Sequence, residues 1–132
     1  MKVCCISNTG ASLPESYIIS DQGYNLETQF NLTLGIEYLV YAIYEWQGNI
    51  WYYICDDNYT YYPQQHPAPL LKVVDNSLSK HWKFELAPNG LLTIAFQEWF
   101  DDCEFYDKLT DMDEKAVIMF ERVKNIMDTE FS

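Results

Sequence analysis

The segment "IEYLVYAIYEWQGNIWYYICDD", residues 36–57, decides the fold class. Its two parts, 36–46 and 49–57, are rich in β-branched and aromatic residues, which favour strands. Gly48 and Asn49 stand between them, and Gly-Asn between two such runs is typical of a β-hairpin. Both faces of each part are apolar, so we expect each strand to be covered on both sides. The segment therefore predicts a central antiparallel hairpin.

Shorter apolar runs on either side extend this sheet. Strands are predicted at 2–7, 70–75, 80–86 and 91–99, with a brief edge strand at 17–20. Pro88-Asn89-Gly90 marks a second hairpin turn. The proline-rich stretch 63–69 is expected to be an extended loop that crosses one end of a barrel. Short strands with frequent turns favour a small antiparallel barrel or a strongly bent sheet.

The period of the apolar residues changes near the C-terminus. From residue 112 onward they recur at spacings of three and four, which is typical of an amphipathic helix. These apolar positions are Met112, Ala116, Met119, Phe120, Val123, Ile126 and Met127. Thr110 or Asp111 is expected to cap the helix, with Glu114 in the capping-box position. We predict one α+β, mainly antiparallel domain over 1–132, with a β core at about 30–99 and a helix at 111–129 packed on it.

Composition limits the classes of partner. The chain has 132 residues, of which 48% are hydrophobic, so it is long and apolar enough to bury a core. Its net charge of −12 argues against nucleic acid or an anionic membrane surface, because phosphate binding needs clustered Lys and Arg. The charge favours a basic partner, although it is also compatible with a role in solubility alone. The N-terminus lacks the apolar run of a signal peptide, so we expect a cytoplasmic protein with free thiols.

The sequence contains no recognisable motif for catalysis, a cofactor or a metal. His66 and His81 lack the spacing of metal ligands, and there is no GxSxG, Walker or GxGxxG pattern. The four cysteines lie in strand-like apolar surroundings, where thiols are usually inert. We therefore expect no enzyme activity, no cofactor and no metal.

The most acidic stretch is residues 98–114, here called the acidic segment. It holds eight acidic residues and one lysine among 17 residues, a net charge of −7. Its last three acids fall where the C-terminal helix is expected to begin, and there they stabilise the helix dipole. Four others gain nothing of that kind and repel one another when packed together. These four are Asp101, Asp102, Glu104 and Asp107. Either they spread into water or a cationic partner relieves the repulsion.

Aromatic residues form the second unusual feature. Ten of the 25 residues from 38 to 62 are Tyr or Trp. A small β core accommodates many rings, but rigid rings beside acids also suit a protein-binding surface. The candidate partner-binding residues are Asp101, Asp102, Glu104, Asp107, Asp56, Asp57, Trp46, Tyr59, Tyr61 and Trp99.

The run from "LTLGIEYL" to "KHWKFEL", residues 32–86, resembles an SH3-like small barrel, with a glycine before the first strand, tight hairpins and a proline turn. In size, acidity, aromatic content and lack of catalytic motifs, the chain resembles the small acidic immunity proteins of bacterial toxin systems, including those of contact-dependent growth inhibition. That resemblance implies a cytoplasmic, non-enzymatic inhibitor that binds one basic toxin domain, such as a nuclease. We expect it to be a monomer or a weak homodimer.

Two other functions stay open at this point. One is a regulatory or structural module that binds an extended or proline-rich peptide on its tyrosine-rich face, with weak and salt-insensitive affinity. The other is a hydrolase, which requires a cleft where a carboxylate and a polar partner converge.

Overall fold

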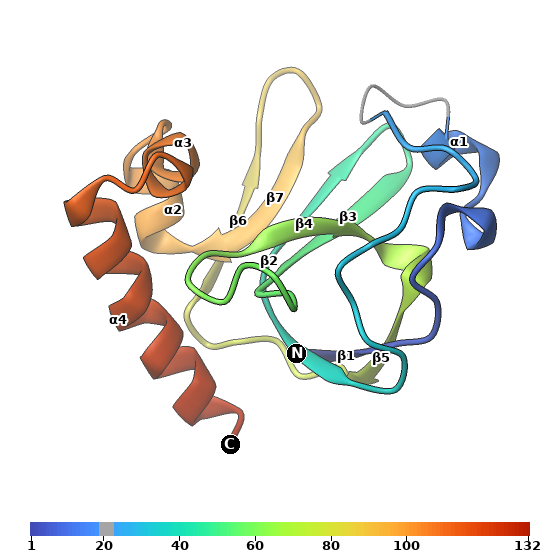
Figure 1. Cartoon of the computed structure of the whole chain (residues 1–132). Coiled ribbons are helices and arrows are strands. Elements are labelled where there is room, and N and C mark those ends of the chain that lie inside the picture. The colour runs from blue at the N-terminus through green and yellow to red at the C-terminus, as the bar shows by residue number, and fades with distance from the viewer. Residues whose placement is uncertain (19–22) are drawn as a thin grey trace.

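The computed structural model describes residues 1–18 and 23–132. It has one antiparallel sheet with helices beside it, and the long C-terminal helix lies along one side of the molecule (Figure 1). The strands are β1 (Lys2–Cys5), β2 (Glu37–Trp46), β3 (Asn49–Ile54), β4 (Gln64–Pro67), β5 (Leu71–Asp75), β6 (Trp82–Leu86) and β7 (Leu92–Phe96). The helices are α1 (Glu15–Ile18), α2 (Gln97–Asp101), α3 (Phe105–Thr110) and α4 (Glu114–Glu130), with short 3-10 helices η1 (Gly10–Ser12) and η2 (Ala68–Leu70). The predicted α+β class is confirmed.

The sheet is open rather than closed. Its strand order is β4-β3-β2-β1-β5, and the β6–β7 hairpin branches from β2. All strand pairings in the described part of the chain are antiparallel. Of the two predicted forms, a small barrel or a bent sheet, the structure has the bent sheet.

The predicted central hairpin is confirmed as β2 and β3. Trp46 pairs with Asn49, so the turn consists of Gln47 and Gly48. Both have positive φ angles, 53° and 85°. A two-residue turn with two positive φ angles matches the twist of the flanking strands, and glycine adopts this conformation without steric cost.

β2 carries a β-bulge at Tyr41. Val40 and Ala42 pair with consecutive residues of β3, so Tyr41 is the extra residue. Before the bulge, residues 37–39 pair with β1; after it, residues 43–45 pair with β7. Two strands therefore share one edge of β2 and diverge at the bulge, which is where the sheet bends.

Two hydrogen bonds satisfy backbone groups of β2 at the bulge, which is the branch point where β1 and β7 diverge. The Val40 N–H donates to the Met1 carbonyl over 3.1 Å. The indole Nε1 of Trp82, the first residue of β6, donates to the Tyr41 carbonyl over 3.0 Å. A buried carbonyl without a donor costs about 1–3 kcal/mol. Because the indole supplies a donor to the Tyr41 carbonyl, it stabilises the bulge at which the two strands diverge.

Helix α4 packs against the sheet at the same bulge. Its buried residues are Ala116, Phe120, Val123 and Met127. The Phe120 ring contacts the rings of Tyr41 and Phe96, with centroids 5.4 and 6.2 Å apart. The Tyr41 hydroxyl donates to Oδ1 of Asp128 over 2.7 Å. Burial, and then this hydrogen bond, raises the pKa of Tyr41 well above its usual range, so the hydroxyl keeps the proton that it donates.

The amphipathic C-terminal helix is confirmed, but its start differs from the prediction. Asp113 is the N-cap, and its Oδ2 accepts a first-turn backbone N–H over 3.1 Å. Thr110 instead ends α3, and Asp111 follows it as the C-cap. Met112 has a φ of 62°, which separates the two helices. Met112 and Ile126, both predicted for the buried stripe, are 57% and 44% exposed.

Three predicted segments have a different structure. Tyr17 and Ile18 belong to α1 rather than to an edge strand, and residues 19–20 of that prediction lie outside the described residues. Residues 97–99 begin α2 instead of extending β7, because Phe96 and Trp99, three positions apart, pack against each other with centroids at 5.6 Å.

The third segment is the proline-rich stretch 63–69, which was predicted as a loop. Its residues 64–67 form β4 and pair with β3, and η2 follows directly. β4 is the outer strand of the sheet on that side. Proline is tolerated at a sheet edge because the missing N–H breaks no interior ladder.

We predict that Trp82→Phe destabilises the protein by about 2 kcal/mol, because it leaves the Tyr41 carbonyl buried without a donor. Urea denaturation measures the free energy of unfolding. Trp99→Phe is the matched control, since the Trp99 indole N–H has no hydrogen-bond partner among the described residues, and we expect it to cost less than about 1 kcal/mol. Equal losses in the two variants would show that the indole hydrogen bond does not stabilise the branch point.

Candidate partner-binding site

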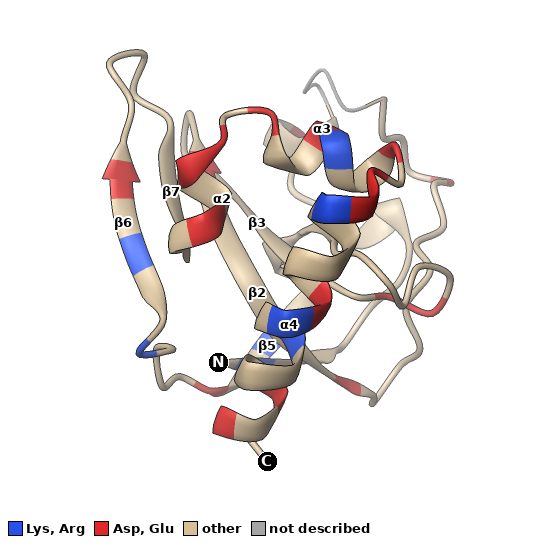
Figure 2. Cartoon of the chain, turned by 90° about the vertical axis from the view of Figure 1, so that its left-hand side faces the viewer, with Lys and Arg blue, Asp and Glu red and all other residues tan. Residues whose placement is uncertain are grey.

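Aromatic residues anchor the short helices of the acidic segment. The Phe96 ring at the end of β7 contacts the rings of Trp99 and Phe105, with centroids 5.6 and 5.8 Å apart. The Tyr106 hydroxyl donates to the Pro63 carbonyl over 2.7 Å, which ties α3 to the loop before β4. Because these rings take the inward positions of α2 and α3, the carboxylates of the same helices face outward. Figure 2 shows the acidic positions gathered on α2, α3 and the start of α4.

A groove of about 600 Å³ lies between α2, α3 and the first turns of α4. We call it the acidic groove. Its carboxylates are Glu98, Asp101, Asp102, Asp113 and Glu114. Its other lining residues are Lys108, Lys115, Phe105, Ala116 and Met119. The groove therefore combines an excess of negative charge with an apolar floor.

Ion pairing within the protein satisfies little of this charge. Lys108 Nζ lies 2.7 Å from Oδ2 of Asp102, whose Oδ1 accepts the Glu104 N–H over 2.9 Å. The contact with Lys108, and then that N–H, lowers the pKa of Asp102, and Asp102 in turn raises the pKa of Lys108. Asp101 accepts a hydrogen bond from Gln97 over 2.8 Å. In the described part of the chain, no groove carboxylate except Asp102 forms an ion pair with Lys or Arg.

The structure brings the four predicted acids of this segment close together. Asp101 and Asp102 line the acidic groove. Glu104 and Asp107 are exposed, Glu104 as the N-cap of α3 and Asp107 in its first turn, and neither lines the groove. Glu104 is close enough to Lys108 to contribute to the raised pKa of that amine. The four acids thus form one negative region, in which Asp102 alone is ion-paired.

Three groove carboxylates were not among the predicted site residues: Glu98, Asp113 and Glu114. The sequence assigned the last two to the helix dipole, and Asp113 does cap α4. Their position opposite Asp101 depends on the turn at Met112, whose positive φ has no clear sequence signal. The only available signal was the high density of acids in the segment.

None of the four predicted aromatic site residues lines the acidic groove. Trp99 is half-buried and stacks on Tyr106 with ring centroids at 5.4 Å. Trp46 and Tyr59 are also half-buried and pack against the core. Tyr61 is the exposed member of a tyrosine cluster, with 44% of its surface accessible. These rings therefore serve mainly in packing.

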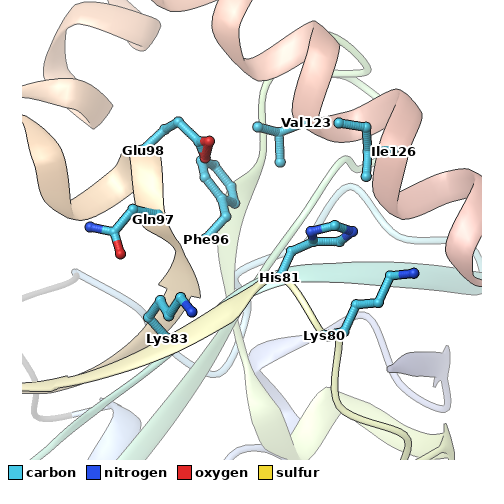
Figure 3. A pocket seen from close by; sticks show the side chains of 8 residues that line it. All are labelled: Lys80, His81, Lys83, Phe96, Gln97, Glu98, Val123 and Ile126. Atoms are coloured by element: carbon cyan, nitrogen blue, oxygen red, sulfur yellow. The ribbon is translucent and has the colours of Figure 1, made fainter.

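A second groove, of about 190 Å³, separates β6 from α4 and gathers basic side chains (Figure 3). Lys80, His81 and Lys83 line it together with apolar residues such as Val123. Glu98 lines both grooves. The positive and negative regions thus meet at α2, and the basic side chains lie on the β6 side of it.

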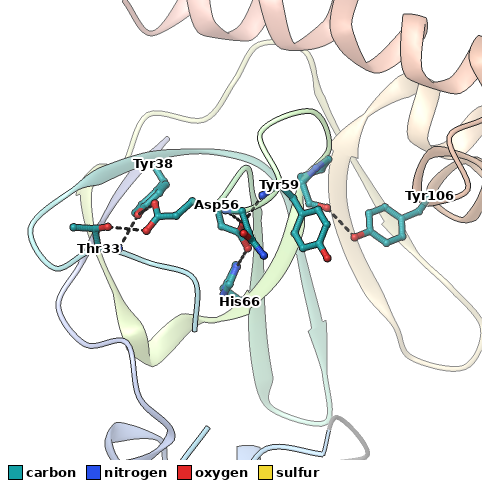
Figure 4. Close-up of polar contacts among 9 residues, drawn as sticks. Thr33, Tyr38, Asp56, Tyr59, His66 and Tyr106 are labelled. Carbon is teal, nitrogen blue, oxygen red and sulfur yellow. Dashed lines mark hydrogen bonds and ion pairs between the residues drawn. The ribbon is translucent and has the colours of Figure 1, made fainter. Parts of the chain in front are cut away.

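Asp56 is a structural residue rather than part of a surface. It is 4% exposed, and its Oδ2 lies 2.8 Å from Nε2 of His66 in β4 (Figure 4). Its Oδ1 accepts the N–H groups of Asn58 and Tyr59, each over 2.9 Å. The prediction that Asp56 contacts a partner is wrong, because these bonds fix the carboxylate inside the β3–β4 connection.

Asp57 is exposed, but both of its carboxylate oxygens are engaged. Oδ2 accepts the Thr33 hydroxyl over 2.6 Å, and Oδ1 accepts the Tyr38 hydroxyl over 2.7 Å (Figure 4). Burial raises the pKa of Tyr38 to about 12, so Tyr38 remains a donor at neutral pH. Asp57 therefore joins the β3–β4 connection to Thr33, before β2, and to Tyr38, within β2, and it does not line the acidic groove.

The buried Asp56–His66 pair also bears on the hydrolase hypothesis. The other ring nitrogen of His66, Nδ1, is buried and has no partner among the described residues. Neither residue lines the acidic groove or the groove beside β6. Burial raises the pKa of the neighbouring Cys55 thiol to about 12, which keeps it protonated and a poor nucleophile. The geometry favours a structural role for this pair.

Comparison of the chain with protein-family models, with curated proteins and with solved structures finds no match. The resemblance to immunity proteins therefore stays a hypothesis. Among the described residues, no helix combines the length and the apolar character that crossing a membrane requires.

We predict that Asp56 makes stability depend on acidic pH. Burial raises its pKa, but hydrogen bonds from His66, Tyr59 and Asn58 outweigh burial and bring it below the ordinary 3.8. A folded-state pKa below the unfolded value means that the carboxylate stabilises the fold above about pH 4, and that this contribution is lost as pH falls through the folded pKa. We expect Asp56→Asn to lower the free energy of unfolding at pH 7 by about 1–3 kcal/mol.

The same variant should show a shallower loss of stability than the unmodified protein between pH 5 and pH 2, measured by urea denaturation at each pH. Glu27→Gln, at an exposed carboxylate outside the acidic groove, is the control and should leave the profile unchanged. Parallel profiles for Asp56→Asn and the unmodified protein would contradict the assignment.

Proposed function

We propose that this chain is a non-enzymatic inhibitor that binds a basic protein, of the kind represented by immunity proteins against bacterial toxins. The acidic groove would hold Lys and Arg side chains of the partner, such as those with which a nuclease toxin binds phosphate. Neutralising those cations would block the toxin's own substrate site.

The observation that carries this proposal is the unpaired charge of the acidic groove. Five carboxylates line the groove against two lysines, and one of those lysines already pairs with Asp102. Arg122 contacts the Met119 sulfur at 2.9 Å and leaves the groove charge uncompensated. The remaining carboxylates repel one another until a cation from another molecule approaches.

The apolar floor of the groove adds a second reason. Phe105, Ala116 and Met119 lie beneath the carboxylates. Lys and Arg carry a long apolar stem below a charged head, so their stems would cover these residues while their heads meet the acids. A small metal cation gains nothing from such a floor, whereas a basic side chain does.

Charge of this kind acts mainly on the rate of association. A net charge of −12 attracts a basic partner over distances of about one Debye length and speeds its encounter with the groove. The contacts made inside the groove then determine the rate of dissociation. Binding through the tyrosine cluster around Tyr61 would instead be insensitive to salt, so salt dependence distinguishes the peptide-binding alternative.

The test uses the double variant Asp101→Lys and Glu104→Lys. Both carboxylates belong to the negative region and neither is ion-paired in the described part of the chain, so reversal breaks no internal salt bridge. After affinity capture from the native host identifies the partner, association is measured by stopped flow across a salt series. We expect the variant to associate about tenfold more slowly and with a flatter salt dependence.

The matched control is Glu15→Lys with Glu27→Lys, which changes the net charge equally at exposed positions outside the groove. It should retain the larger part of the unmodified association rate. If the two double variants associate at the same rate, net charge alone drives association and the groove is not the binding site.

A further inference from the structure

Strand β6 leaves one edge of the sheet open. In the described part of the chain it pairs with β7 alone, and in Figure 2 it stands outermost beside β7. Two of its side chains, Phe84 and Leu86, are 64% and 59% exposed. An open edge that carries large apolar residues is a template for pairing with another strand.

The hydrogen-bond pattern shows which backbone groups are available. The Ala87 N–H donates to the Leu91 carbonyl over 2.9 Å, so residues 87 and 91 form a hydrogen-bonded pair. Such pairs alternate along an antiparallel ladder, so the N–H and C=O groups of Lys83 and Glu85 also face β7. Those of Phe84 and Leu86 therefore face away from it, and no partner pairs with them within the described residues.

The sequence of β6, Trp82-Lys83-Phe84-Glu85-Leu86, is complementary to itself when read in the opposite direction. If two copies pair antiparallel with Phe84 opposite Phe84, then Lys83 of each copy lies opposite Glu85 of the other. The two rings form a cross-strand aromatic pair on one face, and the two ion pairs form on the other. Aromatic pairs and opposite charges both stabilise antiparallel strands.

We infer that the β6 edge is the interface of a homodimer, in which β6 of two copies joins the two sheets through this register. The Phe84 N–H of each copy donates to the Phe84 carbonyl of the other. The Leu86 N–H of each donates to the Trp82 carbonyl of the other, since that carbonyl also faces the open edge. None of the β6 residues in this contact lines the acidic groove, which is formed by α2, α3 and α4.

Charge fixes the register of this pairing. A shift that centres the pair on residue 83 places Lys83 opposite Lys83, and one centred on residue 85 places Glu85 opposite Glu85. Like charges directly opposite destabilise a strand pair, so neighbouring registers are disfavoured.

The two other sheet edges in the described part of the chain, β4 and β5, do not offer the same match. β4 contains Pro67 and follows Pro63, which lack an N–H to donate. In β5, Lys72 and Asp75 are three positions apart. When a strand pairs antiparallel with its own copy, two residues that lie opposite each other must both direct their backbone groups toward the same side, either toward the partner or away from it. These directions alternate along a strand, so the numbers of two opposite residues are equal or differ by an even number. Lys72 and Asp75 therefore cannot meet across a β5 dimer.

The contact is short, so the dimer is expected to be weak. A five-residue strand buries less than the roughly 1,200–2,000 Å² that stable complexes bury, and each copy carries a charge of −12. Salt of about 0.15 M screens charges beyond about 8 Å and leaves the adjacent Lys–Glu pairs in place. We expect a monomer–dimer equilibrium that shifts with protein concentration under these conditions.

A charge-swap series tests the inference by sedimentation velocity over a range of concentrations. Lys83→Glu and Glu85→Lys each place like charges opposite each other twice, so each should weaken dimerisation by about tenfold. The double variant Lys83→Glu with Glu85→Lys restores opposite charges at both positions and should restore the dimer. Circular dichroism checks that each variant is folded.

Amide hydrogen exchange gives an independent readout of the edge. In the dimer, the amides of Phe84 and Leu86 should exchange more slowly as concentration rises. The amide of Glu85 faces β7 in both states and should not change. A protein that stays monomeric at every concentration, or a double variant that stays as weak as the single ones, would overturn the inference.

Discussion

The hydrogen bond from the Trp82 indole to the Tyr41 carbonyl, 3.0 Å long, lies where the two halves of the structure diverge. Before this bulge β1 pairs with the edge of β2, and after the bulge β7 pairs with the same edge. The same tyrosine contacts Phe120 with its ring and Asp128 with its hydroxyl, so it also positions α4. The helices α2, α3 and α4 follow β7, so their position, and that of the acidic groove between them, depends on the direction in which the β6–β7 hairpin leaves β2.

Features set by local sequence could be predicted, and features set by distant contacts could not. The β2–β3 hairpin and the C-terminal helix follow from short-range period and turn residues, such as Gly48 and the apolar spacing around Phe120. The bulge at Tyr41 depends on a tryptophan 41 positions later, and β4 depends on pairing with β3. Tertiary contacts of this kind override local preference, which is why 63–69 looked like a loop.

The candidate site shows the same division. The density of acids drew attention to Asp101 and Asp102, and both line the same groove. Asp56 and Asp57 are adjacent in sequence and look equivalent, yet the structure buries one and exposes the other. The difference arises from His66, ten positions later, which meets Asp56 only because β3 and β4 are paired. No local pattern distinguishes a carboxylate that will be enclosed from one that will remain at the surface.

The aromatic residues explain how the fold tolerates the acidic segment. Carboxylates crowded on α2 and α3 destabilise these helices by mutual repulsion, whereas the contacts of Phe96 with Phe105 and of Tyr106 with Pro63 bind the helices to the sheet. The rings thus sustain a charged surface that would not be stable on isolated short helices. Any molecule that neutralises those carboxylates removes the repulsion in the folded state only, so its binding and the stability of α2 and α3 are thermodynamically linked. Packing of rings on one side of the helices and charge on the other are therefore two parts of one arrangement, in which the core maintains a surface of crowded carboxylates.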